Sequence, residues 1–96
     1  MRHEFHSEAL AEYEDAARYY ADRDPRVAEQ FVAAVEDAIE RILDSPTRWR
    51  VIADDVHRCL THVFPYGVVY TIEPEFVLIV AVMHCSREPG YWKGRL

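Results

Sequence analysis

Glycine and long apolar runs are both scarce in this sequence, and each scarcity excludes a class of protein. Three of the 96 residues are glycine and half are hydrophobic, which excludes a low-complexity or disordered chain. The longest apolar run, Phe76 to Met83, has eight residues, whereas a membrane-spanning helix needs about 20. We therefore expect one folded domain over residues 1–96 that does not use a membrane as a partner.

Cysteine is also scarce, and the spacing of the two cysteines predicts neither a disulfide bond nor a metal site. Cys59 and Cys85 have the spacing of neither a disulfide framework nor a zinc site. His57 and His62 are expected on opposite faces of a strand, so the histidines and cysteines do not converge as ligands. The first residues, MRHEFH, are charged and lack the apolar segment of a signal peptide. We expect a cytoplasmic protein with no metal and no cofactor.

Positive charge is in short supply, and it is unevenly distributed. The formal net charge is −6. Residues 1–55 contain seven basic and fourteen acidic residues, whereas residues 56–96 contain four basic and three acidic residues. A general nucleic-acid-binding protein has a broad basic surface. Any anion-binding site in this chain must therefore be local and belong to the second half.

The first half of the sequence predicts two amphipathic helices. After a short expected strand over residues 2–6, Ser7 can cap a first helix, whose apolar face contains Leu10, Tyr13, Ala17 and Tyr20. Asp24 and Pro25 are suited to begin a second helix, which should end at the DSP sequence of residues 44–46. Helices joined by so short a link are expected to form an antiparallel hairpin.

The second half predicts strands. After an irregular segment over residues 47–55, strands are expected over residues 56–64, 66–73 and 76–83. The last of these is apolar at every position and should lie inside the sheet. The order β-α-α-β-β-β predicts an α+β fold, in which the helical hairpin covers one face of a mostly antiparallel three-stranded meander joined by the N-terminal strand.

Three stretches together resemble the RelE/ParE superfamily of bacterial type II toxins. They are FVAAVEDAIERILDSP, HRCLTHVFPYGVVYTI and VLIVAVMHCSREPGYWKGR, and they extend the resemblance over nearly the whole chain. The resemblance implies a compact toxin that is neutralised by a cognate antitoxin protein. RelE-like members cut messenger RNA on the ribosome, and ParE-like members inhibit DNA gyrase. Our first hypothesis is ribosome-dependent mRNA cleavage; the alternatives are gyrase inhibition by protein binding, and an inactive member that only binds its antitoxin.

Four residues are candidates for catalysis of RNA cleavage. The resemblance implies that Arg58 and Arg87 are the cleavage arginines, and a guanidinium fork binds phosphate oxygens well. His84 can act as an acid or base near neutral pH, and Tyr91 lies near the family's catalytic tyrosine. This hypothesis requires the Arg58 and Arg87 side chains to meet beside the imidazole at one rim of the fold.

Three further residues of the C-terminal tail are candidates for substrate binding. Trp92 can stack on an unpaired base, and Lys93 and Arg95 can attract phosphate. The same tail also suits a gyrase inhibitor, since tyrosine, tryptophan and arginine dominate protein–protein contacts.

Structural explanations compete with these functional ones. His84 can end a strand with a backbone hydrogen bond, Arg58 can pair with Asp54 or Asp55, and Arg87 can pair with Glu88. Packing is the favoured explanation for Trp92.

Overall fold

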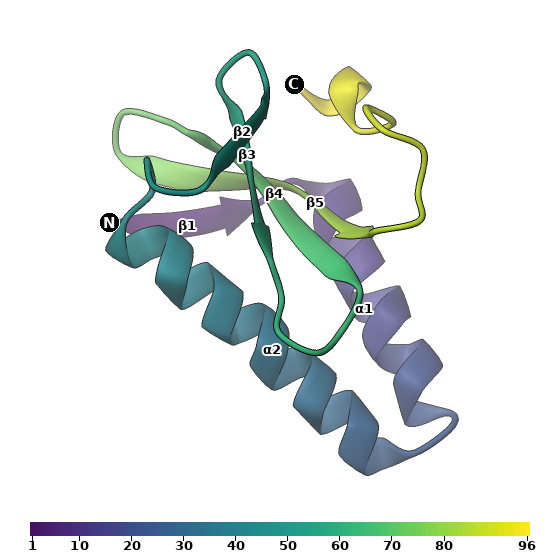
Figure 1. Ribbon diagram of the computed structural model, residues 1–96. Coiled ribbons are helices and arrows are strands. Elements are labelled where there is room, and N and C mark those ends of the chain that lie inside the picture. The colour runs from purple at the N-terminus through teal and green to yellow at the C-terminus, as the bar shows by residue number, and fades with distance from the viewer.

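The chain folds as two helices against one five-stranded sheet (Figure 1), as seen in a computed structural model that describes residues 1–96. The elements in chain order are β1 (Arg2–Phe5), α1 (Ser7–Ala21), α2 (Pro25–Asp44), β2 (Arg50–Ala53), β3 (Val56–Leu60), β4 (Tyr66–Ile72), β5 (Phe76–His84) and a short 3-10 turn at Lys93–Arg95. The strand order is β1-β5-β4-β3-β2, and only the β1–β5 pair is parallel. The expected α+β fold with its helical hairpin is confirmed. Neither helix has the length and apolarity needed to cross a membrane.

The helix starts follow from local capping. At α2, the Asp24 side chain accepts a hydrogen bond from the Arg26 amide at 3.0 Å, and Pro25 occupies the first helical position. The prediction for α2 is therefore confirmed. At α1 the cap is His6 rather than Ser7, because the His6 Nδ1 atom accepts the Glu8 amide at 3.1 Å and Ser7 is already helical.

The structure adds one strand to the predicted meander. The segment expected to be irregular contains β2, which pairs antiparallel with β3. This strand is short and mostly exposed, so it has neither the length nor the alternation by which a strand is identified from sequence. The strand expected over residues 56–64 ends at Leu60, because Thr61 to Pro65 form the turn to β4.

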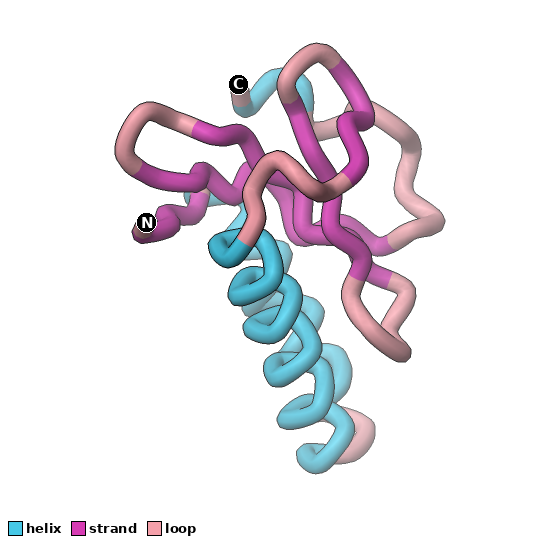
Figure 2. Tube along the Cα trace, turned by 60° about the vertical axis from the view of Figure 1, so that its left-hand side comes forward, coloured by secondary structure: helices cyan, strands magenta, loops and turns pink.

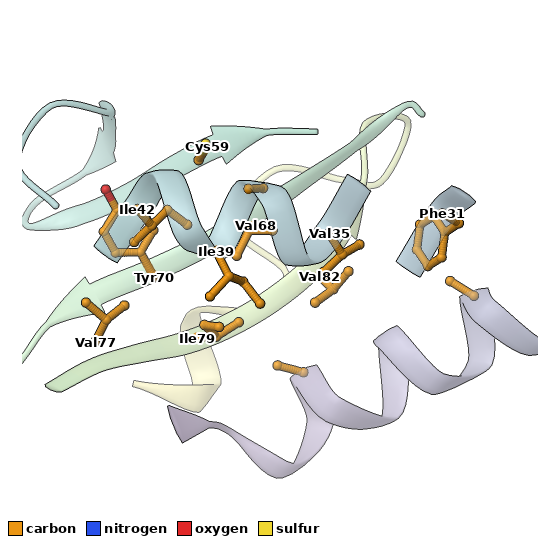
Figure 3. Close-up of a cluster of buried hydrophobic side chains, with 13 residues drawn as sticks. Phe31, Val35, Ile39, Ile42, Cys59, Val68, Tyr70, Val77, Ile79 and Val82 are labelled. Carbon is orange, nitrogen blue, oxygen red and sulfur yellow. The ribbon is translucent and has the colours of Figure 1, made fainter. Parts of the chain in front are cut away.

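The main core lies between the sheet and the helical hairpin (Figure 3). Helix α1 lies against β5, and α2 lies against β3 and β4. Phe31, Val35 and Ile42 of α2 are fully buried, and they face sheet residues that include Val68 and Tyr70. The apolar stripe of the second helix is therefore buried against the sheet, as its 3.6-residue period predicts.

A second, smaller core covers the opposite face of the sheet. It contains Val56, Val69, Val80, Ala81, Met83 and Trp92. Trp92 comes from the C-terminal tail, residues 85–96, which Figures 1 and 2 show on the side of the sheet away from the helices, near the β2–β3 turn. Strand β5 is covered on both faces, as its continuous apolar run predicts. We refer to the two faces as the helix side and the tail side.

A β-bulge in β5 reverses the faces of its last residues. Val69 pairs with Ala81 but Tyr70 pairs with Ile79, so Val80 is an extra residue without a partner in β4. As a result, Val80 and Ala81 both pack on the tail side, and Val82 packs on the helix side. Without the bulge, strict alternation would place residues 82 and 84 on the tail side with Val80.

The tail is fastened to α1 through a mostly buried carboxylate. Glu12 accepts hydrogen bonds from the Tyr91 hydroxyl at 2.6 Å and from Arg95 at 2.9 and 3.0 Å. It also accepts the Val82 amide at 3.1 Å, and Arg95 donates to the Val80 carbonyl at 3.0 Å. These two backbone groups lie on β5 beyond the end of its pairing with β1 at Ile79. The Glu12–Arg95 pair therefore occupies a strand edge that would otherwise be open.

Replacing Phe31 with alanine tests the helix-side core. The ring is fully buried, with its centroid 4.9 to 5.4 Å from the rings of Tyr20, Phe64 and Tyr66. Phe31→Ala should lower the free energy of unfolding by about 3–5 kcal/mol in urea denaturation. The control, Val32→Ala at the partly exposed neighbouring position, should cost less than about 1 kcal/mol. Equal losses in the two variants would contradict this packing.

Replacing Glu12 with glutamine tests the tail fastening. The amide keeps one acceptor oxygen and turns an NH2 group toward donors. Arg95, whose side chain is 11% exposed, therefore loses its nearer counter-charge and keeps only the contact to Glu8 at 3.6 Å. Glu12→Gln should lower the unfolding free energy by about 2–4 kcal/mol. Glu14→Gln, an exposed change on the same helix, should alter it by less than about 0.5 kcal/mol. A Glu12 variant as stable as the Glu14 variant would overturn the assignment.

Candidate functional site

Arg58 and Arg87 meet at one pocket on the tail side of the sheet. The pocket has a volume of about 210 Å³, and Lys93 is its third charged residue. Its lining contains no acidic side chain, and half of it is apolar, including Ile52 and Met83. The two arginines that lie far apart in sequence are thus brought together, and the predicted substrate residue Lys93 joins them.

The Arg58 side chain reaches the pocket by crossing β4 at a glycine. A Cβ atom added to Gly67 would lie 2.9 Å from Arg58 Cδ and 3.0 Å from Arg58 Cγ. Such distances are too short for carbon atoms in contact, so only glycine leaves room for the stem of the arginine here. Arg58 forms no ion pair with Asp54 or Asp55, and Arg87 forms none with Glu88.

Two buried N–H groups at this pocket have no hydrogen-bond acceptor. They are Arg58 Nε and Trp92 Nε1, and no other buried side-chain nitrogen or oxygen in the chain lacks a partner. Both residues line the pocket. Trp92 is 2% exposed and packs in the tail-side core, so its indole belongs to the wall of the pocket and has no open face for a stacked base.

His84 lies on the other side of the sheet. It faces Tyr66 across the β4–β5 pair, with ring centroids 5.1 Å apart. Its Nδ1 atom lies 3.0 Å from the Ser86 amide, which donates to it, and 2.7 Å from the Ser86 hydroxyl. The bulge at Val80 turns His84 to the helix side, so the imidazole does not join Arg58 as the sequence predicted.

Tyr91 and Arg95 are engaged within the protein. Burial and the adjacent Glu12 carboxylate raise the pKa of the Tyr91 hydroxyl above its ordinary value. The Arg87 guanidinium lies 3.8 Å from the centre of the Tyr91 ring, a cation–π contact. Arg95 is bound to Glu12 and to the Val80 carbonyl. Their interactions fasten the tail, which places Arg87 and Lys93 beside the pocket.

Sequence reasoning overlooked Glu12, which gives the helical hairpin a role beyond covering the sheet. A signal was present: Glu12 follows Ala9 by three residues and precedes Ala16 by four, and both alanines are buried. A carboxylate on the buried stripe of a helix requires a partner. The arginines of the C-terminal tail are side chains that could serve as this partner, and Arg95 does so.

The geometry can bind an anion but does not assemble acid–base chemistry at one point. The tail-side pocket offers two guanidinium groups and an ammonium group. The imidazole of His84 lies in a second pocket on the helix side, which Arg87 and Tyr91 also line, and the Tyr91 hydroxyl there is bound to Glu12. No three side chains of histidine, cysteine, aspartate or glutamate are grouped so that they could hold a metal ion.

Comparisons with known proteins agree with this architecture. The family model for the ParE toxin of the type II toxin–antitoxin system parDE matches residues 4–89. A solved structure described as the chromosomal ParDE TA system from P. aeruginosa superposes with a TM-score of 0.75. The two chains are 11% identical, and the match covers 88% of this chain and 95% of the other, so it supports the fold. No curated protein sequence matches this chain.

The family model spans most of the chain, from β1 to the segment that follows β5. It thus includes both helices, strands β2 to β5, the second half of β1 and the pocket residues Arg58 and Arg87. The resemblance noted from the sequence is confirmed: the chain belongs to the ParE toxin family of type II toxin–antitoxin systems.

Proposed function

We propose that this toxin inhibits growth by binding a protein target, DNA gyrase, and that its cognate antitoxin prevents this binding. The observation that supports the proposal is the separation of the groups that RNA cleavage would require. Arg58 lines the pocket on the tail side, whereas His84 lies on the helix side in a second pocket that Arg87 and Tyr91 also line. The Tyr91 hydroxyl is bound to Glu12.

Metal-independent RNA cleavage needs a base, an acid and cations around the same phosphate. Here Arg58 and Lys93 line one pocket and His84 lines another, and Arg87 is the one cation that lines both. Glu12 accepts the hydrogen bond of the Tyr91 hydroxyl, and its negative charge opposes loss of the tyrosine proton. The tail residues Trp92 and Arg95, expected to bind RNA, are instead buried or paired. The structure of this site therefore gives more support to binding than to cleavage.

The charge of the chain also supports a protein target. A net charge of −6 opposes long-range attraction to ribosomal RNA, but a protein surface imposes no such penalty. Arg87 and Lys93 are exposed beside apolar pocket residues such as Ile52 and Met83. Arginine next to apolar surface is typical of the energetically important part of a protein interface.

The first test compares the two activities of the purified chain. We expect it to stall supercoiling by reconstituted DNA gyrase and to leave messenger RNA intact in a translating extract. The same preparation with its antitoxin added should restore supercoiling. Cleavage of messenger RNA without any effect on supercoiling would contradict the proposal.

A second test uses His84→Ala. Because the His84 side chain does not line the tail-side pocket, its loss should change the concentration needed for half-inhibition of supercoiling by less than about threefold. A catalytic acid or base would instead contribute about 10²- to 10⁴-fold to a cleavage rate. If growth arrest disappears in this variant while its circular dichroism spectrum and thermal unfolding are unchanged, the histidine is essential and the proposal fails.

A further inference from the structure

We infer that the tail-side pocket receives the carboxylate of a glutamate or aspartate side chain presented by the inhibited protein. The inference rests on the proposed function and names the chemical group that its site would recognise. Arg58, Arg87, Lys93 and Trp92 are the residues that would hold this carboxylate.

The cations of the pocket have no counter-charge within the protein. None of Arg58, Arg87 and Lys93 forms an ion pair within the protein, although the chain has six more negative than positive charges. Most of the other arginines are paired, including Arg95 in the same tail segment, which is bound to Glu12. Three cations without ion pairs around one cavity, whose lining has no acidic side chain, form a site that is electrostatically suited to an anion.

The pocket also has hydrogen-bond donors without acceptors. Arg58 Nε and Trp92 Nε1 are the two buried side-chain donors that lack an acceptor, and both belong to this pocket. Leaving a buried donor unpaired is unfavourable, and such groups are rare in folded proteins. Trp49 provides the contrast, because its indole N–H donates to the Arg41 carbonyl at 3.1 Å. An incoming oxyanion supplies the acceptors that the protein itself does not.

Size and lining favour a carboxylate side chain over a nucleic-acid phosphate. The cavity of about 210 Å³ is smaller than the 300–1,000 Å³ typical of sites for larger ligands, so it has room for one side chain rather than a nucleotide. Its apolar residues, such as Ile52, Met83 and Pro89, can pack against the methylene stem of glutamate. The acidic helices would meanwhile repel a polyanion.

The depth of the four residues suggests an order of contact. Arg87 and Lys93 are exposed, Arg58 is partly buried, and Trp92 is buried. A carboxylate would therefore meet the two exposed cations first. A small shift of the 85–93 segment, which forms one wall, would then let the shielded N–H groups of Arg58 and Trp92 share its oxygens.

The test of ligand chemistry is a titration followed by ¹H–¹⁵N NMR of the full chain. The probe is the peptide acetyl-Gly-Glu-Gly-amide, and its matched controls are acetyl-Gly-Gln-Gly-amide and dimethyl phosphate at equal ionic strength. The Glu peptide should shift the Trp92 indole resonance in a saturable way and leave the Trp49 indole in place. The Gln peptide should bind at least about tenfold more weakly, because it lacks the charge.

Variants show whether the shift comes from the pocket. Arg87→Gln combined with Lys93→Gln should weaken binding of the Glu peptide by about tenfold or more. Arg2→Gln, which removes one exposed charge from β1, should leave it unchanged. No saturable shift of Trp92, tighter binding of dimethyl phosphate than of the Glu peptide, or equal binding by all variants would overturn the inference.

The second arm tests whether the inhibited protein uses this pocket. The Arg87/Lys93 double variant should lose gyrase inhibition by about tenfold or more, whereas Arg2→Gln should inhibit like the wild type. Full inhibition by the double variant would overturn the assignment of the pocket to this partner. If the wild-type chain does not inhibit gyrase at all, the proposed function fails, and the peptide titration still decides whether the pocket binds carboxylates.

Discussion

The buried carboxylate of Glu12 is the contact on which the candidate site depends. It binds the Tyr91 hydroxyl, the Arg95 guanidinium and the Val82 amide, and so joins helix α1, strand β5 and the C-terminal tail at one point. Because the tail is fixed there, Trp92 packs on the tail side of the sheet and Lys93 lies beside Arg58. Removing the carboxylate would leave the mostly buried Arg95 with only the longer contact to Glu8, at 3.6 Å, and a strand edge partly open, two costs that the fold avoids.

One extra residue in β5 decides which candidate residues can act together. The bulge at Val80 places Met83 beside the pocket and His84 on the helix side. A single-residue change of register reverses the direction of every later side chain. The same bulge therefore separates the imidazole from Arg58, whereas Arg87 lines both the tail-side pocket and the helix-side pocket of His84.

The larger features of the fold could be predicted from the sequence because they depend on local rules. The apolar stripe of α2, the Asp24–Pro25 start and the continuous apolar run of β5 each have one simple structural interpretation. The meeting of Arg58 with Arg87 was also predicted, although the support for it was resemblance rather than periodicity. Strand β2 was overlooked because four largely exposed residues carry almost no pattern.

The details of the site depend on contacts between distant residues, which no local pattern reveals. Alternation predicts the face on which a side chain lies only while the strand remains regular. The face of His84 therefore could not be predicted without knowing that β5 contains a bulge. Arg95 and Tyr91 were expected to face a substrate, since the partner that engages them lies about 80 positions earlier in the chain. Glu12 itself could have been noticed, because it lies between two buried alanines on one helix face.

The most direct test of this account is native-state hydrogen exchange in Glu12→Gln compared with the wild type. The amides of Lys93, Arg95 and Leu96 are hydrogen-bonded within the tail, and the amides of α2 report on the main core. If the Glu12 carboxylate fastens the tail, the tail amides should exchange at least about tenfold faster in the variant, beyond any change in the α2 amides. Tail and core amides that keep the same relative protection in both proteins would contradict the account.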